Sequence, residues 1–534
     1  MKQPRILIDF GLNEHKPSQF DVWMPMLQPF KRMSRFTIAT ILILICLIST
    51  LEFVVQGLSL FRLDEAGYGD SYILYDVLQF QKTGRIYRNL AEPPFLPAQY
   101  SPLVYALYSL PGRVASWDNP FVGPRLLAIA TFIACICVMT SIVRVLFRSR
   151  LVWVWGLLLP FSIGPIPVWI LMLRGDFAGL ALSLLAVRLL LSDLRWAVPL
   201  SAVCAGLAVQ VKFTFVAAAL AGAGWLLVQG RWREVVRFVG FFAVSSLGLY
   251  LLYSLREPGM MSQMLALSPG IRNVAGNVAI MKKVAGELVI LLSLVGLASV
   301  EWHASARETL LALYLATTFV VAAVTAVHAG ADINYYWETF FAAVPFAVLG
   351  VLRLLELVER HAALGPALAV FLFIHSLVPV AMSAEERIPT LKHGWVDAGN
   401  DEMRKLSHAL AGSRVFSSFP RLALLTPNPP LMEPFLLSYL HRLGKVDLRI
   451  FTDPLLRREY DVVITYASAG SWRNVKQLDP ELRSAIESSY KPYCTFHRGL
   501  FHFPDGEDPS TSILKERLTE IGCSPASDEA KKNW

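Results

Sequence analysis

Residues 63–110 read LDEAGYGDSYILYDVLQFQKTGRIYRNLAEPPFLPAQYSPLVYALYSL and form a polar, aromatic and acidic segment between two hydrophobic runs. The preceding run, residues 36–57, is long and apolar enough to cross a bilayer, so this segment begins at a membrane face. Ionised side chains beside a bilayer are costly to desolvate and usually serve a purpose. Asp64, Glu65 and Asp70 follow the run closely, and we take them as candidate catalytic carboxylates.

The composition excludes a soluble globular protein. Hydrophobic residues make up 54% of the 534 residues, charged residues only 17%, and the mean hydropathy is +0.48. Apolar stretches of about 20 residues recur between short basic or polar links, which is typical of an α-helical polytopic membrane protein. The net charge of +8 does not indicate nucleic-acid binding, because the basic residues gather at the ends of the apolar runs, as the positive-inside rule predicts.

The apolar runs predict about eleven transmembrane helices, the last at residues 366–381. Placing the basic clusters inside puts the amino terminus in the cytoplasm and the carboxy-terminal part outside. The expected parts are a cytoplasmic tail at 1–35, a transmembrane part at 36–384, its first external loop at 58–119, and an external domain at 385–534. This orientation places the candidate acids and the other external loops on one face of the membrane.

From about residue 385 the composition becomes that of a soluble domain large enough to fold alone. The pattern predicts a small α/β domain with strands at 414–417, 422–425, 446–451, 461–466 and 495–503, and helices at 401–410, 433–442 and 480–490. Cys494 and Cys523 lie in this part and can pair if it faces an oxidising compartment. The sequence has no Asn-x-Ser/Thr site, which is typical of a bacterial protein, so we expect the inner (cytoplasmic) membrane.

The order of residues in the first external loop resembles that of the C-type (GT-C) membrane glycosyltransferases, the superfamily of the protein mannosyltransferases and the lipid A aminoarabinose transferases. Its pattern has an acid near the end of the first span, a short helix closing on Gly-x-x-Tyr, and a Tyr-x-Pro-Leu entry to the next hydrophobic stretch. Here Asp70, residues 84–87 and residues 100–103 match it. Ser71 follows Asp70 where many relatives have Glu, and Asp64 with Glu65 is a competing register.

The resemblance implies a GT-C-like fold and the transfer of a hexose or pentose from a polyprenyl-phosphate donor on the external (periplasmic) face, with inversion at the anomeric carbon. Such a reaction needs a base for the acceptor hydroxyl, cations for the leaving phosphate, and a groove for the lipid. Asp70 is the favoured base, because a carboxylate is ionised near neutral pH. Asp64 and Glu65 are the alternatives. The expected partners are membrane lipid, the lipid-linked sugar, and a glycan, lipid or protein acceptor.

Four basic residues are candidates for the donor phosphate. Lys212 lies at the outer end of two consecutive apolar runs, at the depth of a lipid phosphate, although a lysine there can also serve only as an interface anchor. Arg174 and Asp176 resemble an Arg-x-Asp pattern that recurs in GT-C enzymes after the third span, and arginine suits bidentate phosphate contact. Arg272 and Lys282 lie in a later external loop.

Further polar residues near the external face are candidates for sugar contacts. Residues 334–338 read NYYWE and resemble an Asn-Tyr-aromatic segment of the family. Aromatic residues at this depth commonly form an interface belt, but Asn334 and Glu338 have no such explanation. The substrate-binding candidates are Tyr72, Tyr100, Asp176, Asn334, Tyr335 and Glu338. No Cys-x-x-Cys or histidine cluster indicates a metal site, and a requirement for a divalent metal stays open.

Two other functional classes compete with the glycosyltransferase. A transporter or flippase of a lipid-linked or anionic substrate should show internal repeats and charges at mid-bilayer, whereas here no clear repeat occurs and the acids gather at one face. A scaffold that only displays the carboxy-terminal domain would need neither the acids nor the tyrosine-rich loop. We therefore expect a glycosyltransferase.

Overall fold

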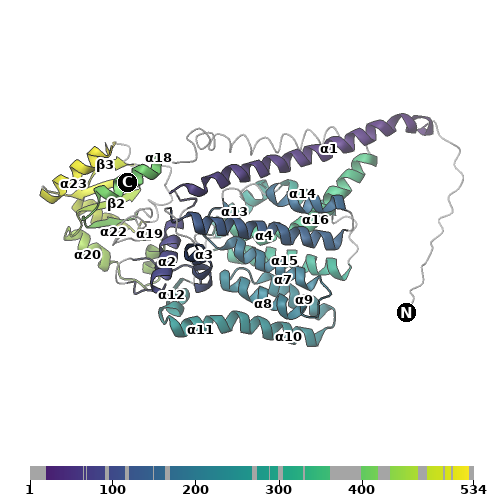
Figure 1. Ribbon diagram of the computed structural model, residues 1–534, viewed down its shortest axis with the longest axis horizontal. Coiled ribbons are helices and arrows are strands. Elements are labelled where there is room, and N and C mark those ends of the chain that lie inside the picture. The colour runs from purple at the N-terminus through teal and green to yellow at the C-terminus, as the bar shows by residue number, and fades with distance from the viewer. Residues whose placement is uncertain are drawn as a thin grey trace.

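The computed structural model describes residues 20–63, 65–67, 69–90, 95–114, 119–147, 150–162, 169–267, 274–287, 289–298, 305–328, 331–360, 398–418, 433–466, 478–496, 499–506 and 509–527. Asp64, Arg272, the predicted span at 366–381 and the predicted strand at 422–425 lie outside these residues. A bundle of helices forms the larger part of the molecule, and a sheet with its own helices lies beyond one end of the bundle (Figure 1).

The bundle is built from helices that are apolar over much of their length. Its helical elements are α1 (Phe20–Gly57), η1 (Leu58–Phe61), α2 (Asp70–Thr83), α3 (Pro102–Val114), α4 (Val122–Leu146), α5 (Arg150–Leu158), η2 (Leu159–Ser162), α7 (Asp176–Leu190), α8 (Ala197–Val211), α9 (Ala217–Val228), α10 (Trp232–Ala243), η3 (Val244–Gly248), α11 (Leu249–Arg256), α12 (Gly259–Leu267), α13 (Val274–Glu287), α14 (Val289–Ala298), α15 (Ala306–Thr325), η5 (Ile333–Tyr336) and α16 (Trp337–Arg360).

Several of these helices are suited to a membrane. Among the described residues, the helical runs long and apolar enough to cross it are Phe36–Phe61, Val122–Leu146, Trp232–Arg256, Ala306–Thr325 and Ile333–Val358. Shorter apolar helices occur at Val152–Phe161, Ala197–Val211 and Ala217–Val228. The run over α10 and α11 keeps most of its side chains on the outside of the bundle, whereas the run over α16 is mostly buried. The count of about eleven spans stays a prediction.

Aromatic rings and small residues fill the centre of the bundle. Phe132 of α4 packs against Phe177 of α7 with ring centroids 5.0 Å apart, and Trp337 of α16 is fully buried beside them. Ala202 and Ala205 of α8 are also fully buried, and side chains of this size let helix backbones approach closely in a membrane. This packing holds α7, α8 and α16 against one another, and each of these helices begins or ends next to residues of the candidate site.

Residues 58–119, which the sequence predicts to be the first external loop, include two short helices, α2 and α3, which lie between the bundle and the sheet (Figure 1). Gly84 ends α2 in the left-handed conformation, with φ of +68°, and its N–H donates to the carbonyl oxygen of Phe80 at 2.9 Å. Glycine adopts this conformation without the steric cost that a side chain adds. The short helix that the sequence predicts to close on Gly-x-x-Tyr is therefore confirmed.

The carboxy-terminal sheet has five strands in the order β1-β2-β4-β3-β5. The strands are β1 (Val415–Ser417), β2 (Val462–Tyr466), β3 (Tyr490–Phe496), β4 (Gly499–Pro504) and β5 (Ser524–Pro525), and β1 pairs in parallel with β2 while the other pairs are antiparallel. The helices around it are α18 (Ala398–Ala409), α19 (Pro434–Arg442), α20 (Arg449–Leu456), α22 (Pro480–Ser489) and α23 (Pro509–Glu520).

The sheet carries a separate hydrophobic cluster on each face, because successive strand residues point to opposite sides. Val462 and Ile464 of β2 pack with residues of α18 and α23, whereas Val463 packs with residues of α19, α20 and α22. Cys494 of β3 forms a disulfide with Cys523, the pairing that the sequence left open, and their Cα atoms are 5.7 Å apart.

The structure corrects two of the predicted strands. Residues 446–451 do not form a strand, because α20 begins at Arg449 and buries Phe451 and Leu455, which lie one helical turn apart. The single strand predicted at 495–503 is instead the end of β3 and most of β4, which pair with each other. An alternating or apolar stretch this short fits either a strand or one side of a helix, and tertiary packing decides between them.

Gly350 of α16 lies where this helix crosses α14. A Cβ atom at Gly350 would collide with the backbone carbonyl of Leu294, and a backbone cannot rotate aside as a side chain can. We expect Gly350→Ala to lower stability by about 1–3 kcal/mol, seen as a lower thermal unfolding midpoint in detergent. Gly296→Ala on α14 is the matched control, because a Cβ there meets nothing within 4 Å. Equal midpoints for both variants would contradict the close crossing.

Candidate active site

Two aspartates of the site begin helices in the same way. Asp70 is the first residue of α2 and Asp176 the first of α7, and each follows a glycine in the left-handed conformation, Gly69 with φ of +91° and Gly175 with φ of +68°. The positive end of a helix dipole stabilises a carboxylate at this position. Both aspartates are buried, so the Gly-Asp sequence at each helix start places an acid inside the protein.

Asp70 is held by backbone groups from two parts of the chain. Its Oδ2 accepts a hydrogen bond from the N–H of Gly67 at 3.1 Å, and its Oδ1 accepts one from the N–H of Leu173 at 3.2 Å. Glu65 lies next to it and accepts from the N–H of Ser71 at 3.0 Å. The two acids that the sequence offered as competing registers thus form one acidic pair.

Burial dominates the protonation of this pair. It raises the pKa of Asp70 to about 6, although the positive charges of Arg174 and Arg125 oppose the increase. It raises the pKa of Glu65 to about 7, and the charge of Asp70 adds to that increase. A carboxyl group with a pKa near the working pH is well matched to taking and releasing a proton. At neutral pH Asp70 is therefore mostly ionised, while Glu65 is shared between both forms.

Arg125 is a member of the site that the sequence reasoning missed. Its guanidinium is buried in the first turns of α4 and donates to the backbone carbonyls of Arg62 and, at 3.2 Å, of Leu60. It thereby fixes the segment that leads from α1 to the acidic pair. A lone arginine inside an apolar run was the available signal, because charges within spans are rarely without a role.

A second cluster contains residues from three distant segments. The Nζ of Lys212, at the end of α8, lies 2.7 Å from Oδ1 of Asp176. The Nδ2 of Asn334 donates to the other oxygen of Asp176 at 3.1 Å. The ring of Tyr335 lies beneath the ammonium group, 4.6 Å from Nζ to the ring centroid. The structure thus brings together four of the residues proposed for donor and sugar binding.

The segment at residues 173–176 connects the two clusters. Leu173 donates to Asp70, and three residues later Asp176 pairs with Lys212. Between them the guanidinium of Arg174 stacks over the ring of Trp169, 4.8 Å from its centroid. The positive charges of Arg174 and Lys212 also act on the phenol of Tyr100, whose pKa burial holds above its ordinary value. Tyr100 therefore lies close to both cations.

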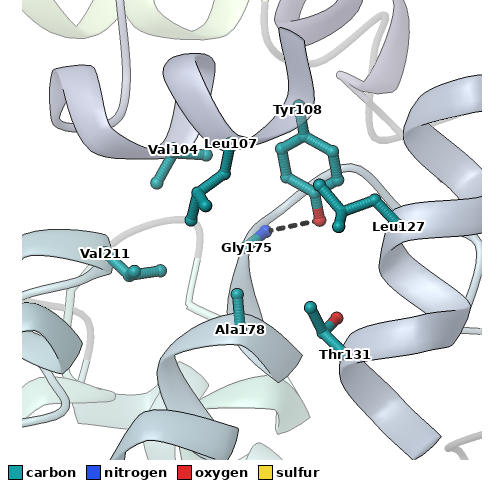
Figure 2. A pocket seen from close by; sticks show the side chains of 8 residues that line it. All are labelled: Val104, Leu107, Tyr108, Leu127, Thr131, Gly175, Ala178 and Val211. Atoms are coloured by element: carbon teal, nitrogen blue, oxygen red, sulfur yellow. Dashed lines mark hydrogen bonds between the residues drawn. The ribbon is translucent and has the colours of Figure 1, made fainter. Parts of the chain in front are cut away.

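A small apolar cavity lies beside this segment, where α3, α4, α7 and α8 meet (Figure 2). Above it the hydroxyl of Tyr108 accepts a hydrogen bond from the N–H of Gly175 at 3.2 Å. The residues lining the cavity are Val104, Leu107, Tyr108, Leu127, Thr131, Gly175, Ala178 and Val211. Gly175 and Val211, which line the cavity, are the chain neighbours of Asp176 and Lys212, so the cavity lies beside the lysine cluster.

The remaining predicted residues lie elsewhere. The hydroxyl of Tyr72 donates to the backbone carbonyl of Ser418 at 3.3 Å, and so faces the carboxy-terminal sheet. Glu338 is buried inside the bundle, where Ser183 and Tyr314 donate to its Oε1 at 2.5 and 3.0 Å. Lys282 is exposed on α13.

Glu257 is a second residue that the sequence reasoning did not single out. Its buried carboxylate accepts from the N–H groups of Ile86 and Tyr87 at 2.8 and 2.9 Å, and so fixes the end of the Gly-x-x-Tyr motif. The hydroxyl of Tyr87 in turn donates to the carbonyl oxygen of Tyr100 at 2.6 Å. Among the residues described, no group of three or more His, Cys, Asp or Glu side chains could hold a metal ion.

Solved structures with a similar fold include ArnT from Cupriavidus metallidurans in the apo state, with a TM-score of 0.56, 13% sequence identity, and coverage of 85% of this chain and 97% of that one. The same protein bound to undecaprenyl phosphate gives a TM-score of 0.55 with the same identity and coverage. The chain has a GT-C-like fold.

A more distant structure shares this GT-C-like fold. The oligosaccharyltransferase of Archaeoglobus fulgidus in the apo form matches with a TM-score of 0.51 and 10% identity over 88% of this chain and 74% of that one. No protein-family model matches the sequence, and no curated protein is similar to it at a significant level. The long apolar helices indicate a membrane protein, and the fold expected from the pattern in residues 63–110 is confirmed.

The pKa of Asp70 predicts how stability depends on pH. Its folded-state pKa of about 6 lies above the ordinary value of 3.8, so its contribution to stability is complete below about pH 4 and is lost as the pH rises through 6. We expect Asp70→Asn, which removes the buried charge, to raise the free energy of unfolding at pH 8 by at most about 3 kcal/mol, seen as a higher unfolding temperature than that of the unmodified protein. The difference should disappear at pH 4.

Asp505→Asn, which alters an exposed acid, is the control for this measurement and should show no such pH-dependent gain. If the difference in stability between Asp70→Asn and the unmodified protein is the same at pH 8 as at pH 4, burial of the ionised carboxylate does not destabilise the protein and the prediction is wrong.

Proposed function

We propose that this chain is a membrane glycosyltransferase that moves a sugar from a polyprenyl-phosphate donor to an acceptor on the external face of the membrane. One observation carries the proposal: a single backbone segment, residues 173–176, holds Asp70 at one end and the Asp176–Lys212 pair at the other. A base and a phosphate-binding cation are thereby kept a short distance apart. ArnT, which shares this fold, is solved with undecaprenyl phosphate bound, which supports a lipid-linked donor.

In the proposed reaction Asp70 takes the proton from the acceptor hydroxyl as its oxygen attacks the anomeric carbon. The bond between that carbon and the phosphate oxygen breaks, and the lipid phosphate leaves with the electron pair. Glu65, which lies next to Asp70, is the second acid of the pair and is proposed to pass the proton on. Attack from the side opposite the phosphate gives inversion, whether the sugar is a hexose or a pentose.

The cations are proposed to receive the leaving phosphate. Lys212 offers a compact ammonium group that Asp176 and the ring of Tyr335 hold in place, and Arg174 offers a planar guanidinium beside it. Charge-assisted contacts of this kind stabilise a phosphate as its charge develops. Asn334 orients Asp176 and is close enough to the pair for its amide to contact the sugar as well.

The other candidate residues also have proposed roles. Tyr100 lies close to both cations and is proposed to contact the sugar. Glu338, which accepts a hydrogen bond from Ser183 inside the bundle, is proposed to support the site. Arg272 and Lys282 remain proposals for a more distant contact with the donor phosphate. Asp64 remains an alternative acid. A divalent metal stays open, and no step above depends on one.

The orientation belongs to the proposal too. Arg188 lies in the last turn of α7, at the opposite end from Asp176, and Arg231 follows α9, whose start lies near Lys212; under the positive-inside rule these basic residues support a site on the outside. The Cys494–Cys523 disulfide suits an oxidising compartment such as the bacterial periplasm. We therefore propose an inner-membrane protein with the tail at 1–35 inside and the domain at 385–534 outside.

A transporter or flippase is the less favoured alternative. The paired acids and cations lie at one end of the bundle, as a site that works at one face requires, and the similar structures are an ArnT and an oligosaccharyltransferase. Alternating access instead needs a binding site near the middle of the membrane.

Replacing the proposed base tests the reaction. In vesicles containing undecaprenyl-phosphate hexoses and pentoses, with lipid and glycan extracts of bacterial envelopes as acceptors, we expect Asp70→Asn to lower the release of undecaprenyl phosphate by about 10²- to 10⁴-fold. Binding of undecaprenyl phosphate should change little. Asp64→Asn and Glu65→Gln, made in parallel, should be milder. If Asp64→Asn alone abolishes release, the base is Asp64; if all three variants remain fully active, the glycosyltransferase proposal fails.

Replacing the proposed phosphate ligand tests donor binding separately from chemistry. Removing a charge-assisted contact should cost about 2 kcal/mol, so Lys212→Ala should raise the Kd for undecaprenyl phosphate roughly thirtyfold. Binding can be followed by isothermal titration in detergent. Lys491→Ala, which removes an exposed lysine of the carboxy-terminal sheet, is the matched control. An unchanged Kd in Lys212→Ala and Arg174→Ala would leave both residues as interface anchors.

A further inference from the structure

The first external loop and the carboxy-terminal sheet are joined by buried contacts at two points. The first is the hydrogen bond from the hydroxyl of Tyr72 to the carbonyl oxygen of Ser418, which directly follows β1. Both residues are buried, so water does not replace this bond easily. Tyr72 lies on α2 two residues after Asp70, within the turn of helix that positions the acid.

The second contact is made by Phe95. Its side chain is 4% exposed and packs edge-on against the ring of Phe451 of α20, with centroids 4.5 Å apart. Its carbonyl oxygen accepts a hydrogen bond from the N–H of Glu433 at 3.4 Å. Among the described residues of that cluster of buried side chains, every member except Phe95 comes from residue 416 or later. The loop therefore supplies a side chain to the core of the sheet.

The packing contact of Phe95 lies on one face of the sheet. The cluster on the opposite face, which includes Phe503 and Cys494, contains only residues from 403 to 523 within the described part of the chain. A loss of packing there weakens the sheet but removes no contact with the loop. The two faces thus allow a role in stability to be separated from a role in positioning the loop.

We propose that the carboxy-terminal sheet is a clamp that holds the first external loop in place, and that Tyr72 and Phe95 are positioning residues that keep Asp70 in its buried position. The inference rests on the proposed function, because Asp70 is there the base. The physical reason is that α2 is a short helix between a glycine turn at Gly69 and the left-handed Gly84, and has little stability of its own.

The clamp predicts local changes that need no substrate. In amide hydrogen exchange of the full chain in detergent, Phe95→Ala should speed exchange at residues 70–76 and at Leu173 by at least tenfold, and Tyr72→Phe by a smaller factor. Phe503→Ala and Tyr490→Phe are matched controls, because Phe503 is similarly buried on the other face and the hydroxyl of Tyr490 donates to the carbonyl oxygen of Tyr460 rather than to the loop.

The controls should speed exchange in the sheet and leave residues 70–76 unchanged. If Phe503→Ala loosens α2 as much as Phe95→Ala does, the effect is one of general stability and the clamp is refuted. If Phe95→Ala leaves the exchange of α2 unchanged, the clamp is refuted as well.

A second test measures sugar transfer in the vesicle assay with undecaprenyl-phosphate sugars. Phe95→Ala should lower kcat about tenfold or more with KM for the donor unchanged, and Phe95→Leu, which refills most of the volume, should restore it. The acidic limb of kcat should also move to lower pH, because water entering beside Asp70 lowers its pKa. The charged or titratable groups that face Asp70 are Glu65, Arg125 of α4, Arg174 and Tyr108 of α3.

The two proposals fail in different ways. If the unmodified protein transfers no sugar from any donor, the proposed function fails, while hydrogen exchange still decides whether the clamp exists. If the unmodified protein is active and Phe95→Ala shows looser α2 amides with an unchanged kcat and pH profile, the positioning role of Phe95 is overturned.

Discussion

The hydrogen bond from the N–H of Leu173 to Asp70 is the contact on which the arrangement of the site depends. It ties the start of α2 to the bundle at the residue that begins the 173–176 segment. Three residues of extended chain span at most about 11 Å, so the Cα atoms of Leu173 and Asp176 cannot lie farther apart than that. The proposed base and the proposed phosphate ligand are therefore both tied to the same short segment of backbone.

The buried charges of the site compensate one another locally. Asp176 is matched by Lys212, and the acidic pair of Glu65 and Asp70 lies within reach of Arg125 and Arg174. Burial still raises the pKa of both acids, so the compensation at the acidic pair is incomplete. Incomplete compensation suits a base, because a fully paired carboxylate binds a proton too weakly to accept one from a hydroxyl group.

The sequence predicts the parts of this structure that depend on local pattern. The apolar runs, the helix that ends at Gly84 and most elements of the carboxy-terminal sheet follow from composition, periodicity and glycine placement. The pairing of Asp176 with Lys212 and Asn334 depends on how α7, α8 and η5 pack together, which no local pattern encodes. Arg125 was missed for the same reason, because its partners are backbone carbonyls of a distant segment.

Glu338 helps to hold the lysine cluster in place. It accepts a hydrogen bond from Ser183, which lies on α7 two helical turns beyond Asp176. Asn334, one turn before Glu338, bonds to Asp176 itself. Two side-chain contacts about 10 Å apart along α7 therefore join it to the segment that begins α16, so neither helix can slide or rotate without breaking one of them. A transporter would need such helices to move, whereas a base and a phosphate ligand that act on one bound sugar benefit from a fixed frame.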